Sequence, residues 1–133
     1  MSQANVELVY RAHDAFNRRD IDALRALSDP DMEFISALVE LEGGGPYRGH
    51  DALQRWRENV FGVFPDFSAE VEEVRDLGEV TVARVRLRGQ GMESDAPTEA
   101  TLWEVVEWRR SKAIRWRHFR SEAEALEAAG LSE

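Results

Sequence analysis

The stretch from Thr98 to Arg120 constrains this chain most, because it is typical of two strands joined by a tight turn at residues 109–112. With the turn centred on Ser111, period-2 alternation puts one set of side chains on one face: Leu102, Glu104, Val106 and Trp108, opposite Arg120, His118, Trp116 and Ile114. A loop one residue shorter would instead place His118 opposite Trp103 and break this largely apolar face. We therefore predict the register that keeps the face continuous and sets Glu104 beside His118.

Length and charge bound the other possibilities. A chain of 133 residues fits a single domain, residues 1–133, with its own core. A net charge of −9 repels polyanions, so we expect no nucleic-acid partner. The sequence has no cysteine, no apolar run of membrane-spanning length and no visible signal peptide. We therefore expect a cytoplasmic protein with no disulfide and no membrane contact.

The first half of the chain is typical of helices around one strand. A first helix is expected from Asn5 or Ser2 to residues 17–20, and Asp20 can cap a short second helix that residues 28–30 end. Residues 31–42 have an extended pattern. A third helix with Leu53 and Trp56 on its apolar stripe follows, and Pro65 ends it.

The second half is typical of long antiparallel strands. Residues 67–77 and 80–89 alternate, and a bulge is expected at Glu72–Glu73, where the alternation shifts. Ser121 and Glu124 form a capping box for a closing helix that Gly130 ends. This order predicts an α+β fold, in which a curved antiparallel sheet wraps around helices on one face as a cone and encloses a pocket.

The pocket residues are expected on the faces that point toward one another. His13 lies on the apolar stripe of the first helix, where a core histidine with one hydrogen bond is favoured over a catalytic one. Aromatic residues at helical spacing are likewise more often core than pocket. The residues expected to line the pocket are His13, Phe16, Phe34, Tyr47, Trp56, Leu102, Val106, Trp116 and Arg120.

Glu104 and His118 are the candidate catalytic pair. A glutamate beside an imidazole can fix its tautomer and raise its basicity, which makes a general base. The alternative is a structural pair that satisfies two polar groups in an apolar wall, and this alternative is favoured. The three histidines have no metal-ligand spacing, and no nucleotide-binding loop is present, so we expect no metal and no cofactor.

The outer face of the long strands is expected to be rich in charges. Arginines between residues 84 and 117 can pair across strands with Glu99 and Glu107, which favours a surface of ion pairs over a nucleic-acid site. Four apolar residues share this face and predict a homodimer through it: Val80, Val82, Trp103 and Phe119.

Three stretches resemble the nuclear transport factor 2-like superfamily and, within it, the SnoaL-like proteins related to polyketide cyclases. They are NVELVYRAHDAFNRRDIDALRALSDPDMEF, GPYRGHDAL and KAIRWRHFRSEAEALEAAGL, which occur in the family's order, and the resemblance as a whole extends over nearly the whole chain. The resemblance implies the cone-shaped fold and a homodimer. It does not fix the function, because this fold hosts isomerases, cyclases, hydrolases and non-catalytic binders.

Carried over residue by residue, the resemblance is partial. Ketosteroid isomerases have a tyrosine where this chain has Ala12 and a carboxylate base where it has Ser36, so steroid isomerisation is disfavoured. Their second acid falls near Glu104, and the aspartate of polyketide cyclases falls near His118. Of the carboxylate–arginine–carboxylate triad of epoxide hydrolases only one carboxylate is evident here, with Arg120 as a candidate partner, so the triad is incomplete.

The sequence thus predicts a domain that binds a small, largely apolar organic molecule. Whether it is an enzyme stays open. One hypothesis is a cofactor-independent isomerase, cyclase or hydrolase that uses acid–base chemistry, and the other is a non-catalytic ligand-binding or protein-interaction domain. An open, lined cavity would favour the first hypothesis, and a cavity filled by side chains would favour the second.

Overall fold

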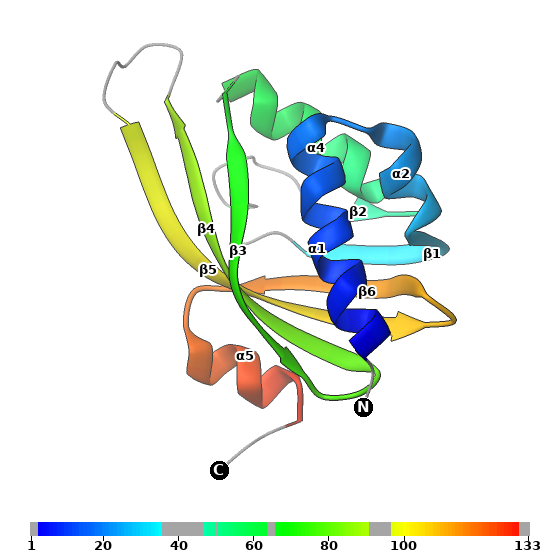
Figure 1. Cartoon of the computed structure of the whole chain (residues 1–133). Helices are drawn as coiled ribbons and strands as arrows, with labels where there is room; N and C mark the ends of the chain where they lie inside the picture. Colours follow the sequence, from blue (N-terminus) through cyan, green and yellow to red (C-terminus); the bar gives the residue numbers. More distant parts are fainter. Residues whose placement is uncertain (1–2, 36–46, 50, 64–65, 91–96, 131–133) are drawn as a thin grey trace.

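The computed structural model of the chain describes residues 3–35, 47–49, 51–63, 66–90 and 97–130 (Figure 1). Its elements are α1 (Gln3–Arg18), α2 (Ile21–Ala26), β1 (Ser28–Ile35), β2 (Tyr47–Arg48), α4 (Ala52–Val63), β3 (Ser68–Asp76), β4 (Val80–Gln90), β5 (Pro97–Arg109), β6 (Lys112–Phe119) and α5 (Glu122–Ala128). The predicted α+β order is confirmed. The strand expected over residues 31–42 starts earlier, at Ser28, and its continuation past Ile35 lies outside the described residues, as does Pro65.

The strands form one curved, open sheet in the order β2-β1-β6-β5-β4-β3 (Figure 1). Neighbouring strands run antiparallel except β1 and β6, which are parallel. The predicted antiparallel sheet thus includes one parallel pair of strands. The two strands start side by side. The Ala113 N–H at the start of β6 donates to the carbonyl of Leu27 at 2.7 Å, and Leu27 connects α2 to β1, so β1 begins beside the start of β6 and runs in the same direction.

Helices cover both faces of the sheet, which corrects the expectation of helices on one face. The main core joins α1, α2 and α4 to the concave face of the sheet (Figure 1). The closing helix α5 packs on the convex face, where Ala125 contacts a smaller cluster around Val82 and Val105. As expected, Ser121 caps α5 by accepting a hydrogen bond from the Glu124 N–H, and Gly130 follows it with a φ of 91°.

The hairpin combines both registers considered from the sequence. At its tip Trp108 pairs with Ala113, so the turn is one residue shorter than predicted, and Arg110 and Ser111 take the left-handed conformation of a tight hairpin turn. A register shift between Glu107 and Trp108 then restores the predicted pairing from Glu107 onward. Ile114 is the extra residue, and it is half-buried instead of buried. The other predicted core residues of this face are buried: Leu102, Val106, Trp108 and Trp116.

Two further features fix the frame around the site. The bulge predicted at Glu72–Glu73 is confirmed by a register shift between Val71 and Glu73. The side chain of Asn17 pairs with the backbone of Ala69 on the edge strand β3, donating to its carbonyl at 2.8 Å and accepting from its N–H at 2.9 Å. These paired hydrogen bonds hold α1 against the sheet at a fixed height.

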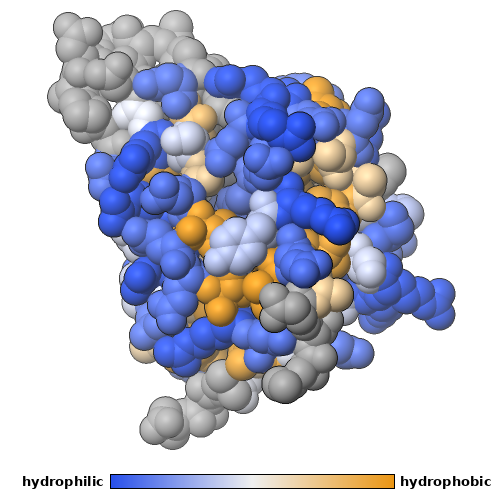
Figure 2. All heavy atoms as spheres, in the orientation of Figure 1, coloured by the Kyte–Doolittle hydropathy of each residue, from blue (hydrophilic) through white to orange (hydrophobic). Residues whose placement is uncertain are grey.

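The face of the molecule over α1 and β3 is mainly hydrophilic, with apolar atoms showing near its centre (Figure 2). Among the described residues, the exposed large hydrophobic side chain is Tyr10 of α1. None of the helices in the described part of the chain is long and apolar enough to cross a membrane.

Candidate functional site

Glu104 and His118 face each other across β5 and β6, as the hairpin parity predicts. They are paired residues in the ladder, and His118 Nε2 lies 3.1 Å from Glu104 Oε2. Both residues are buried, at 3% and 7% exposed. The expected contact is present on the concave face, beneath the helices.

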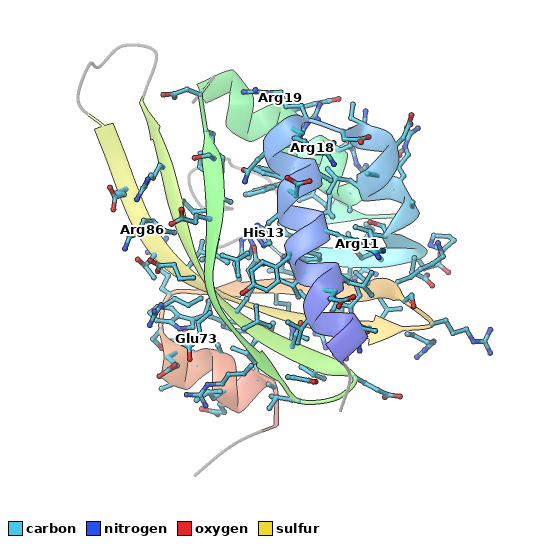
Figure 3. The ribbon with its side chains drawn as sticks, viewed as in Figure 1. Arg11, His13, Arg18, Arg19, Glu73 and Arg86 are labelled. Carbon is cyan, nitrogen blue, oxygen red and sulfur yellow. The ribbon has the colours of Figure 1, made fainter. Side chains whose placement is uncertain are left out.

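His13 is the third member of this group. It points from α1 toward the strands (Figure 3), and its Nε2 lies 2.7 Å from Glu104 Oε1. The expected core histidine with one hydrogen bond is therefore what the structure contains, but its partner is the candidate carboxylate. We call His13, Glu104 and His118 the buried triad. The helical stripe was the only sequence signal for His13, and it does not indicate which residue the imidazole meets.

The triad keeps its carboxylate ionised. Burial alone would raise the pKa of Glu104, but attraction to His13 and the hydrogen bonds from both imidazoles outweigh it and lower the pKa from 4.5 to about 2. An ionised carboxylate only accepts hydrogen bonds, so both Nε2 atoms carry their protons. In the neutral form of an imidazole that donates from Nε2, the lone pair is on Nδ1. Neither Nδ1 has a hydrogen-bond partner among the described residues.

The triad borders a small apolar cavity of about 20 Å³. The ring of His118 packs edge-on against Phe34 and Trp56, with ring centroids 5.1 and 5.6 Å away. A cavity of this size holds about one water molecule, so side chains fill most of the predicted pocket. The cavity is lined by Ala12, His13, Phe16, Leu24, Phe34, Leu53, Trp56, Ala69, Leu87, Glu104, Trp116 and His118.

A sequence profile of the SnoaL-like domain family matches residues 9–118. This chain belongs to the SnoaL-like domain family. A search of curated protein sequences finds no match to this SnoaL-like domain.

Solved structures show the same fold. A nuclear transport factor 2-like protein of unknown function from Burkholderia pseudomallei has a TM-score of 0.79 at 22% identity, covering 96% of this chain and 97% of its own. IdmH from Streptomyces antibioticus, a proposed polyketide cyclase, has a TM-score of 0.77 at 21% identity, covering 97% and 99%. A proposed SnoaL-like polyketide cyclase from a Jannaschia species has a TM-score of 0.75 at 20% identity, covering 100% and 97%.

Five of the predicted pocket residues line the cavity of this SnoaL-like domain: His13, Phe16, Phe34, Trp56 and Trp116. The other four do not. Leu102 and Val106 are buried in the core beside the cavity, and Tyr47 packs against the ring of Phe34 with centroids 6.0 Å apart. Arg120 is exposed, because β6 ends at Phe119 and the chain there turns out toward α5.

The small residues of the lining escaped the sequence argument. Ala12, where isomerases carry a tyrosine, and Ala69 leave the space that the cavity occupies. Their signal was only their place in the apolar periodicity of α1 and β3. Ser36, which matches the isomerase base, lies outside the described residues. Among the described residues, no group of three or more His, Cys, Asp or Glu could hold a metal ion.

Proposed function

We propose that this SnoaL-like domain binds a small, largely apolar organic molecule and acts on it by cofactor-independent acid–base chemistry. The observation that supports this most is the buried triad, a carboxylate shared by two imidazoles at the wall of an aromatic-lined cavity. Glu104 fixes both tautomers, and His118 or His13 presents Nδ1 as the base. Buried ionisable groups that perturb one another mark functional sites more often than chance.

The test is ligand-dependent stabilisation. A molecule that binds the native state raises the melting temperature, and the increase grows with the logarithm of its concentration once the site is saturated. We expect members of a library of small aromatic and alicyclic ketones, esters and phenols to stabilise the wild type but not His118→Ala or Glu104→Gln. Glu107→Gln is the matched control, because it makes the same change three residues along β5 on the opposite face. Equal stabilisation of the wild type and both triad variants would contradict the proposal.

A second candidate function is non-catalytic binding or protein interaction. The cavity supports it, because about 20 Å³ is far below the few hundred Å³ of typical ligand pockets. Under this function the triad ties α1 to the sheet and no library compound stabilises the protein. The thermal-shift screen therefore separates the two functions.

The homodimer and the cytoplasmic location also stay predictions. The apolar patch offered for the dimer is smaller than expected, because Val82 is buried in the cluster that α5 covers. Val80, Trp103 and Phe119 are half-buried around it. Light scattering at micromolar concentration is the test, and a monomer mass would rule the dimer out.

A further inference from the structure

Three residues that line the cavity each have a buried polar atom without a partner among the described residues. His13 Nδ1, His118 Nδ1 and Trp116 Nε1 are each buried and have no hydrogen-bond partner among the described residues. All three residues line the same cavity. Buried polar atoms are nearly always hydrogen-bonded, so a group of three unpartnered ones calls for a polar occupant.

The size of the cavity decides what that occupant is. Its volume of about 20 Å³ exceeds the ~10–15 Å³ that one water needs. A buried water also needs two to four polar partners. The lining supplies them as two acceptors, the imidazole Nδ1 atoms, and one donor, the indole N–H.

We propose that the cavity holds one water molecule on His13, His118 and Trp116, and that the chemistry of the site is the addition of this water to an electrophilic carbon. The chemical part of this proposal rests on the proposed function and narrows it to hydrolysis or hydration. Internal proton transfer, as in an isomerase, needs no water at the base. The substrate class is an apolar molecule with an ester-like carbon.

The step balances on the residues present. The water oxygen bonds to the acyl carbon of an ester while one water proton passes to Nδ1 of His118 or His13. The resulting imidazolium keeps its Nε2–H on the ionised Glu104, which stabilises the new charge. The bond from the acyl carbon to the alkoxy oxygen breaks, and the alcohol leaves with the electron pair and the proton from Nδ1. The products are a carboxylic acid and an alcohol.

A high-resolution crystal structure of the wild type tests the water site. We expect one water within hydrogen-bonding distance of Nδ1 of at least one triad histidine. A dry cavity, or a water that contacts neither histidine, overturns the inference. Ala69→Val, which fills the cavity from β3, should expel this water and leave the hydrogen bonds of Glu104 in place.

Hydrolysis of 4-nitrophenyl acetate, followed by the absorbance of 4-nitrophenolate, tests the chemistry. We expect the rate above background to fall about 100-fold in Glu104→Gln and in Ala69→Val. Ala100→Val, the same substitution at an exposed site of β5, should keep the wild-type rate. A wild-type rate in Ala69→Val would overturn the role of the water. If the cavity is dry but ligand binding depends on the triad, the inference of a water fails and the proposed function stands. If the water is ordered but no compound in the screen binds, the proposed function fails and the water site stands.

Discussion

The two faces of the sheet use carboxylates in opposite ways. On the concave face a single buried carboxylate, Glu104, meets two imidazoles. On the convex face, carboxylates such as Glu73 meet the arginines of β4 in solvent, and Figure 3 shows Glu73 and Arg86 on the side of the sheet away from His13. The convex contacts repeat along the strands, with N–O separations from 2.7 to 3.9 Å. They join Arg84, Arg86, Arg88, Arg115 and Arg117 to Glu33, Glu72, Glu73, Glu99 and Glu107.

The difference lies in what surrounds the charges. Water screens a half-exposed pair and solvates either partner when the other is removed, so each pair contributes little. A buried carboxylate has no such alternative, and its two imidazoles are its only ligands among the described residues. The ion pairs of the convex face can therefore replace one another. The three residues of the buried triad depend on one another, so a substitution at any one of them disrupts the group.

The largest expected effect is at His118. His118→Ala removes a partner of the buried carboxylate and leaves a cavity beside Phe34, so we expect the free energy of unfolding to fall by about 3–5 kcal/mol. Urea unfolding followed by tryptophan fluorescence gives the value. His118→Gln, which keeps a donor near Glu104, should recover part of the loss. A change below about 1 kcal/mol in His118→Ala would mean that the triad is no more demanding than the convex pairs.

Acid should weaken the concave face selectively. Because the pKa of Glu104 is about 2 in the folded state against 4.5 for the free group, its ionised form stabilises the fold above pH 4.5, and this stabilisation is lost as the pH falls toward 2. The shift corresponds to about 3 kcal/mol. Unfolding measured at pH 6 and pH 3 should show a smaller drop in Glu104→Gln than in the wild type. Glu107→Gln on the convex face should keep the wild-type drop, and an equal drop in all three proteins would refute the assignment.

A double-mutant cycle measures how far the triad acts as a unit. His13 and His118 bind opposite oxygens of one carboxylate, so the losses of unfolding free energy from the two substitutions should not be additive. We expect an interaction energy of about 0.5–3 kcal/mol. The cycle compares the wild type with His13→Gln, His118→Gln and the double variant, and urea unfolding gives the free energy of unfolding of each protein. The matching cycle on Arg88 and Glu99, 3.9 Å apart on the convex face, should give a value near zero. Additivity in the triad would show that the histidines act independently.

The sequence predicts the two faces unequally well. Alternation with a period of two places Glu104 and His118 together, because a strand has only two faces and the apolar one must point inward. It also predicts that Glu99 and Glu107 pair with arginines on the convex face, but not the pairs that Glu33, Glu72 and Glu73 make there. The contact of His13 with Glu104 depends on how α1 crosses the sheet, which the bonds of Asn17 to β3 help to set. A helical stripe carries no information on that angle.

Two other features were out of reach for the same reason. The cavity is small because aromatic rings from different elements, such as Phe34 and Trp56, pack at 5.1 Å, and their rotamers depend on the whole core. The convex position of α5 depends on the direction of the chain after β6. The capping box at Ser121 fixes where α5 begins but not the direction in which it runs. Pairing across a hairpin is a local property, whereas these contacts are not.

The smallest expected effect, on the convex face, completes the contrast. Arg86→Ala removes pairs with Glu72 and Glu99, but its side chain is 36% exposed and each carboxylate keeps another arginine, Arg84 or Arg88. We therefore expect the free energy of unfolding to change by about 0.2–1 kcal/mol, and less in high salt, where screening already weakens the pairs. Urea unfolding at low and high salt gives both values. A salt-independent loss as large as that of His118→Ala would show that the convex network is cooperative, and the distinction between the two faces would then fail.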